Sequence, residues 1–176
     1  MRWRGLLKIV FIFSGIFQPE CFAWQKNMKP EDLIKLLNGQ SAEYIVIGAQ
    51  ALAAHGYVRA TEDLDILINP TQQNIVRVRA ALESFGYDTT DASLEDFQTK
   101  KILFRQYWYE VDIHPNASGV KTQEALQHKI SGLFEGVPCY FSSLDDLIKM
   151  KKAAGRDKDL QDLKVLEEIK RQLKQK

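Results

Sequence analysis

Two aspartates separated by one residue, Asp63 and Asp65, begin a short stretch that alternates polar and apolar side chains before it becomes wholly apolar. On a β-strand, residues two apart point to the same face, so both carboxylates would project together while Leu64 and Ile66 face the core. Carboxylates held this close repel each other unless a positive charge lies between them. Mg²⁺ prefers oxygen ligands and is commonly bound by one or two carboxylates together with substrate phosphates. The pair therefore predicts a divalent metal site, with Mn²⁺ as the alternative to Mg²⁺.

A third aspartate, Asp112, lies in a second alternating stretch, between the apolar residues Val111 and Ile113. If this strand lies beside the first one, Asp112 completes a cluster of three carboxylates. Such a cluster can place one metal on a triphosphate and a second on the attacking hydroxyl, which is the arrangement for in-line phosphoryl displacement. Asp112 would also assist deprotonation of the acceptor. We expect Asp63, Asp65 and Asp112 to be metal ligands and catalytic residues.

A glycine turn precedes these aspartates and is suited to bind phosphate. Gly48 ends an apolar, β-branched run and Gln50 opens a helix, so backbone N–H groups at the helix N-terminus can meet phosphate oxygens. Ala49 is small enough to let a triphosphate approach the backbone closely. Cationic side chains for the polyphosphate are expected from three positions, Arg59, Lys151 and Arg156.

Three further polar residues have plainer interpretations. Asp159 and Asp162 are expected to form ion pairs with Arg156 or to cap the last helix. His114 shares a strand face with Asp112, where it either contacts substrate or is an ordinary strand-end histidine beside a proline.

Hydrophobic periodicity predicts the elements that must position these residues. Helices are expected over residues 31–37, 50–55, 71–85, 122–130, 144–154 and 157–173. Strands are expected over residues 44–47, 63–68, 101–107, 109–114 and 137–141. The order describes an α/β (α+β) fold, with a small mixed sheet and flanking helices.

Length and composition limit the function classes. The chain has 176 residues, 45% hydrophobic and 27% charged, which suits one domain with an ordinary core. A net charge of +1 gives no overall basic field, so a nucleic acid would have to meet a local patch. The two cysteines form no CxxC or Cys/His spacing, which argues against a disulfide framework and a zinc site.

The segment from Gly48 to Ile66, a glycine turn followed after a helix by Asp-x-Asp, resembles the signature of DNA polymerase β-type nucleotidyltransferases. Asp112 fits the third acid of that family. The tail over residues 146–163, with the order Lys…Ala-Gly-Arg…Lys-Asp…Asp-Leu, is similar to the ending of small bacterial nucleotidyltransferases related to AbiEii-type toxins and minimal antitoxin nucleotidyltransferases. The resemblance covers most of residues 43–166 and departs at Ala49, where the family often has Gly or Ser.

The resemblance implies a polymerase β-like fold and transfer of a nucleoside monophosphate from a nucleoside triphosphate to a hydroxyl, with release of pyrophosphate. It leaves the acceptor open among tRNA, a partner toxin and a small molecule, and it suggests a toxin–antitoxin or defence setting. It favours a functional Lys151, although the charges of Lys149, Lys151 and Lys152 alone favour a solvated helix face. The alternative is a catalytically silent module that binds a partner protein or nucleotide. The intact Asp63, Asp65 and Asp112 argue against this alternative.

The N-terminal segment, residues 1–27, differs from residues 28–176, which we assign to the nucleotidyltransferase domain. Its basic residues precede an apolar run over 9–17, the layout of a secretory signal peptide and too short for a membrane span. Alternatively, translation begins at Met28, which is followed by a natural helix opening, and the segment is a miscalled extension. We favour the second interpretation and a cytoplasmic protein, because the chemistry needs intracellular triphosphates; a genuine signal would predict export.

Overall fold

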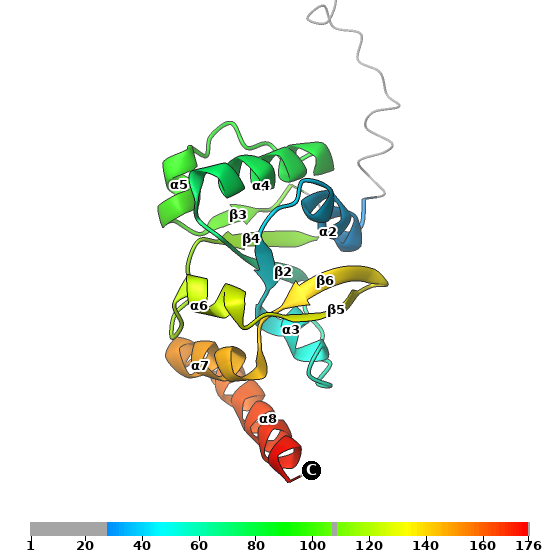
Figure 1. Ribbon diagram of the computed structural model, residues 1–176, viewed down its shortest axis with the longest axis vertical. Coiled ribbons are helices and arrows are strands. Elements are labelled where there is room, and N and C mark those ends of the chain that lie inside the picture. Colours follow the sequence, from blue (N-terminus) through cyan, green and yellow to red (C-terminus); the bar gives the residue numbers. More distant parts are fainter. Residues whose placement is uncertain (1–27, 107–108, 176) are drawn as a thin grey trace, which may run out of the picture.

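The computed structural model describes residues 28–106 and 109–175, so both interpretations of residues 1–27 concern a segment outside the described residues. Its centre is a six-stranded sheet of order β3-β4-β2-β1-β6-β5 (Figure 1). The strands are β1 (Tyr44–Val46), β2 (Asp63–Ile68), β3 (Ile102–Phe104), β4 (Glu110–His114), β5 (Ile130–Phe134) and β6 (Val137–Phe141). The pairs β2/β4 and β1/β6 are parallel and the others antiparallel, so the expected mixed sheet is confirmed.

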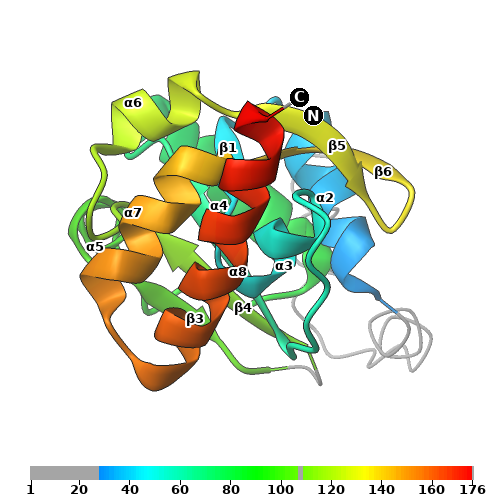
Figure 2. The same ribbon diagram turned by 90° about the horizontal axis from the view of Figure 1, so that it is seen from below.

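Helices flank this sheet, as expected. They are α2 (Pro30–Gly39), α3 (Gly48–Ala53), α4 (Gln72–Phe85), α5 (Leu94–Thr99), α6 (Thr122–Gln127), α7 (Leu144–Ala154) and α8 (Asp157–Lys174). In Figure 1, α2, α4 and α5 lie together at one end of the molecule, and α8 extends from the other end. Figure 2 shows α7 and α8 packed side by side. In the described part of the chain, no helix is long and apolar enough to cross a bilayer.

Alternation along the central strands separates two cores. Leu64, Ile66 and Ile68 of β2 are fully buried in the larger core, which includes the apolar side chains of α2 and α4. Leu67 faces the other way, into a smaller cluster with Met150 of α7. Because residues two apart share a face, the side of β2 that carries Leu67 also carries the aspartates predicted to do chemistry.

Capping residues define the ends of two helices. Thr71 caps α4, since its hydroxyl accepts a hydrogen bond from the backbone N–H of Asn74, and Gly86 ends that helix at φ 106°. Ser143 caps α7 in the same way, and Gly155 ends it at φ 62°. Positive φ is the conformation that glycine adopts without steric cost.

Two elements were not anticipated. The short helix α5 is opened by a capping box between Ser93 and Asp96, a signal present in the sequence. The helix expected to reach residue 130 ends at Gln127, and Ile130 instead begins β5. The β5–β6 hairpin turns at Glu135 and Gly136, both at positive φ, a conformation typical of tight hairpin turns.

Candidate active site

The register of β2 and β4 brings the predicted acids together. The two strands are parallel neighbours, and Asp65 lies opposite Asp112 while Asp63 lies opposite Glu110. Asp65, Asp112 and His114 each offer one ligand atom, and these atoms all lie within 4.8 Å of one another. Two carboxylates and an imidazole at this spacing fit a divalent cation. The strand adjacency expected for Asp65 and Asp112 is thus confirmed, and His114 joins them.

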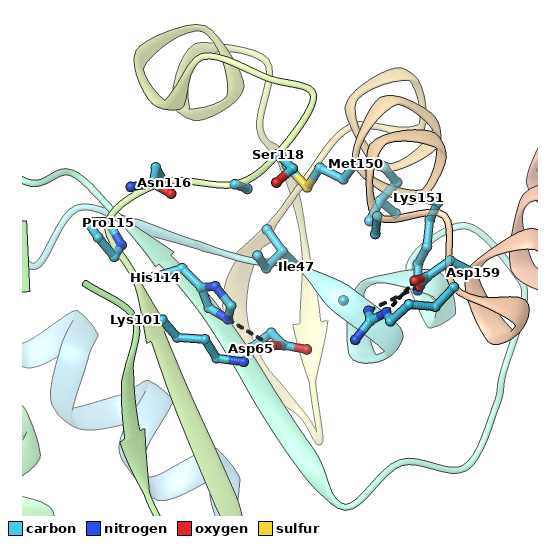
Figure 3. A pocket seen from close by; sticks show the side chains of 15 residues that line it. Ile47, Asp65, Lys101, His114, Pro115, Asn116, Ser118, Met150, Lys151 and Asp159 are labelled. Atoms are coloured by element: carbon cyan, nitrogen blue, oxygen red, sulfur yellow. Dashed lines mark hydrogen bonds and ion pairs between the residues drawn. The ribbon is translucent and has the colours of Figure 1, made fainter. Parts of the chain in front are cut away.

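Asp65 is held as an anion by its surroundings. Burial raises the pKa of this carboxyl, but the His114 hydrogen bond and the charges of His114, Lys101 and Lys151 lower it by more, so the pKa lies below its ordinary value. His114 Nε2 lies 2.9 Å from Asp65 Oδ1, the contact drawn in Figure 3. An anionic carboxylate facing a cavity is ready to accept a cation.

Asp63 lies outside this cluster. Its half-buried carboxylate accepts a hydrogen bond from the Thr61 hydroxyl and lines a small polar cavity that Asp65 also lines. The structure therefore places the two aspartates of the Asp-x-Asp pair beside one cavity, with Asp65 alone of the two in direct reach of Asp112.

Asp112 is already balanced by two cations from the neighbouring strand segment. Lys101 Nζ contacts one carboxylate oxygen, and Arg105 Nη2 lies 2.7 Å from the other. The antiparallel register places Leu103 opposite Asp112, so Lys101 and Arg105 flank it on the same face. Sequence analysis missed both cations. The signal was the alternation Lys-x-Leu-x-Arg, which becomes informative only once β3 is known to pair with β4.

Gly48 is required by its close contact with Asp65. It begins α3 at φ 67°, and a Cβ built on it would overlap Asp65 Oδ2. The backbone at the start of α3 therefore approaches the carboxylate more closely than a residue with a side chain allows. This contact locks the glycine turn to the strand that carries Asp65.

Gly48→Ala is expected to lower the turnover of the site about a hundredfold, because displacement of a ligand by about 1 Å can have that effect. Gly56→Ala is the matched control: Gly56 also has positive φ, 85°, but nothing lies within 4 Å of its built Cβ. It should lose only about 1 kcal/mol of stability. Turnover and urea unfolding of both variants measure this, and equal turnover in the two would contradict a steric role for Gly48.

Two adjoining cavities are both lined by Asp65 and His114 of this cluster, whereas Asp112 lines neither. The larger, of about 280 Å³, is lined by Gly48 and Asp65 on the sheet side and by Lys151 and Arg156 on the helical side. The smaller, of about 150 Å³, shares these four residues and adds Arg59. The predicted cationic residues therefore all line a space shared with Asp63 and Asp65, where they can attract a polyphosphate.

The other residues of the glycine turn have different positions. Ala49 is buried against the core and lines the smaller cavity. The Gln50 side chain turns away and donates a hydrogen bond to the Tyr109 hydroxyl over 2.7 Å. Gln50 lines neither cavity, so its side chain is not brought to the site.

A buried ion cluster fastens the C-terminal helices to this site. Lys151 Nζ lies 3.0 Å from Asp159 and 2.8 Å from Asp162, and these side chains are 7%, 0% and 1% exposed. Arg59, in the loop before β2, lies 3.2 Å from Asp162, while Arg156 donates to Asp159. The expected pair between Asp159 and Arg156 is confirmed. Lys151 is not on a solvated face, and two of its three hydrogens point at aspartates.

The charge of Asp159 is maintained by its partners. Burial raises the pKa of this carboxyl, but hydrogen bonds from Arg156 and Lys151 lower it by more, so the pKa lies below its ordinary value. The cluster of Arg59, Lys151 and Arg156 with Asp159 and Asp162 carries one net positive charge. That excess faces the cavities, because all three cations line the smaller one.

Comparison with known proteins gives one family. A family model described as a nucleotidyltransferase of unknown function (DUF6036) matches residues 30–172, which extends from α2 into α8. No curated protein matches the chain.

Proposed function

The chain belongs to the DUF6036 family of nucleotidyltransferases, and from this premise we propose that it is an active, Mg²⁺-dependent enzyme of the DNA polymerase β type. The reaction is transfer of a nucleoside monophosphate from a nucleoside triphosphate to a hydroxyl. The observation that carries the proposal is the register of Asp65 opposite Asp112, on a face that opens into a cavity lined by cations. Residues 28–176 form the catalytic domain in this proposal.

Asp63, Asp65 and Asp112 are the proposed metal ligands, and His114 adds a nitrogen donor at the same place. A bound divalent ion supplies positive charge to the triphosphate, and Mn²⁺ is the alternative to Mg²⁺. The imidazole makes the site less suited to Mg²⁺ than an all-oxygen site would be, since Mg²⁺ prefers oxygen ligands and imidazole suits transition metals.

The triphosphate is proposed to lie between the glycine turn and the C-terminal helices. Backbone N–H groups near Gly48 and Ala49 face the phosphates, with Arg59, Lys151 and Arg156 as the cationic side. In the transfer, the acceptor oxygen bonds to the α-phosphorus while the bond to the bridging oxygen breaks, and pyrophosphate leaves with the bond's electron pair. Asp112 is the candidate to accept the acceptor's proton.

The acceptor is proposed to be tRNA, a partner toxin or a small molecule, in a toxin–antitoxin or defence setting like that of AbiEii-type proteins. A start at Met28 and a cytoplasmic location are part of the same proposal. A silent module that binds nucleotide or a partner protein is the second candidate. It is favoured by one observation, the occupation of both Asp112 oxygens by Lys101 and Arg105.

The test is transfer of label from each α-labelled nucleoside triphosphate, with Mg²⁺ or Mn²⁺, by the full chain and by a form that starts at Met28. Bulk tRNA and cell lysate serve as acceptors. We expect label transfer that EDTA abolishes and that one nucleotide supports best. Metal-dependent binding without transfer would favour the silent module, and no metal-dependent triphosphate binding in either form would reject the catalytic proposal.

A further inference from the structure

Lys101 and Arg105, the two cations that contact Asp112, are more exposed than Asp112 itself. The Asp112 side chain is 3% exposed, whereas those of Lys101 and Arg105 are 45% and 38% exposed. Lys101 precedes β3 and Arg105 follows it, so both reach inward from the sheet edge. The fixed partner is therefore the carboxylate, and the two cations reach it with long side chains from exposed positions.

A buried carboxylate is costly without a counter-charge, and Lys101 and Arg105 supply that charge. A divalent ion between Asp65, Asp112 and His114 would supply counter-charge to the same carboxylate, both of whose oxygens Lys101 and Arg105 contact. The ion and the two side chains therefore compete for Asp112. The side chains can withdraw without breaking the sheet, because both are partly exposed and neither residue lies within β3.

We propose that Lys101 and Arg105 stand in for the divalent ion at Asp112 and are displaced when it binds, and that Lys101 then contacts the phosphates of the substrate. This inference rests on the proposed function. Lys101 lines both cavities together with Gly48 and Lys151, and Figure 3 shows its side chain extending towards Asp65. Arg105 lines neither cavity and also pairs with Glu110 over 3.0 Å, so towards the metal site its role is to hold Asp112 before the ion arrives.

The test is a Mn²⁺ titration of the full chain, with free Mn²⁺ followed by electron paramagnetic resonance. Lys101→Met and Arg105→Met should each bind Mn²⁺ about tenfold more tightly, because a competing charge is removed. Lys100→Met is the control: Lys100 is 70% exposed and pairs with Asp96. Its Mn²⁺ affinity should match the wild type. Lys101→Met should also turn over more slowly at saturating Mn²⁺.

Thermal unfolding gives a second readout. Without metal, Lys101→Met should melt below the wild type, and Mn²⁺ should raise its Tm more than it raises that of the wild type. Lys101→Gln, which keeps a donor but no charge, replaces it if Lys101→Met does not fold. Unchanged or weaker Mn²⁺ binding in the Lys101 and Arg105 variants would overturn the inference.

Asp112→Asn separates failure of this inference from failure of the proposed function. If Asp112→Asn loses Mn²⁺ binding while the Lys101 and Arg105 variants bind like the wild type, only the competition is refuted. If Asp112→Asn binds Mn²⁺ like the wild type, the ion does not use Asp112, and both the inference and the proposed metal site fail.

Discussion

Asp65→Asn is expected to slow nucleotidyl transfer by about a thousandfold or more, because loss of metal or of preorganised charge at a reacting phosphate has effects of that order. The substitution preserves the size of the side chain and one oxygen but removes the negative charge from the centre of the cluster with Asp112 and His114. Initial rates of label transfer at saturating Mg²⁺ measure the effect. The double variant Asp63→Asn/Asp65→Asn should fall to background.

Asp91→Asn is the matched control, since it removes the same charge from an exposed residue outside both site cavities. Its transfer rate should equal that of the wild type. If Asp65→Asn kept its rate within threefold of this control, Asp65 could not be a ligand of a catalytic metal.

Lys151→Met is expected to destabilise the protein by about 3–5 kcal/mol, the usual effect of removing one partner from a buried ion pair. The Lys151 ammonium is the shared counter-charge of Asp159 and Asp162, which are 0% and 1% exposed. Without it, Asp159 and Asp162, both on α8, keep only their contacts with Arg156 and Arg59 and repel each other from buried positions. The free energy of unfolding in urea, at pH 7, measures the loss.

Lys152→Met is the control on the same helix, because Lys152 is 55% exposed and pairs with Glu167 at the surface. It should change the free energy of unfolding by about 0–1 kcal/mol. Adding Asp159→Asn and Asp162→Asn to Lys151→Met should recover part of the loss, since the two buried negative charges that Lys151 neutralised are then gone. A loss below about 1 kcal/mol in Lys151→Met would mean that water reaches the cluster.

The ion cluster also changes the role assigned to Lys151. Its position in a run of lysines favours a solvated face, and the family resemblance favours phosphate binding, yet the structure gives it a buried structural role at the edge of the cavity. With two of its three hydrogens directed at aspartates, one remains for a phosphate. Stability and substrate binding at Lys151 are therefore linked, and its variants need both measurements.

Local patterns in the sequence were enough to predict most of the helices and strands. The period-two alternation around Asp63, Asp65 and Asp112 identified two strands and the faces of their carboxylates. Thr71 and Gly86 marked the ends of α4, because capping depends on residues within a few positions of one another. The mixed sheet with flanking helices followed from their order.

The tertiary structure decided which strands are neighbours and in what register. Asp65 and Asp112 are 47 positions apart in the chain, and only the parallel pairing of β2 with β4 places them opposite each other. The same holds for Lys101 and Arg105, which no local pattern connects to Asp112, and for Arg59, which reaches Asp162 of α8. Alternation determines which face of a strand a side chain occupies. The partner across the sheet depends on long-range packing, which residues close in sequence do not encode.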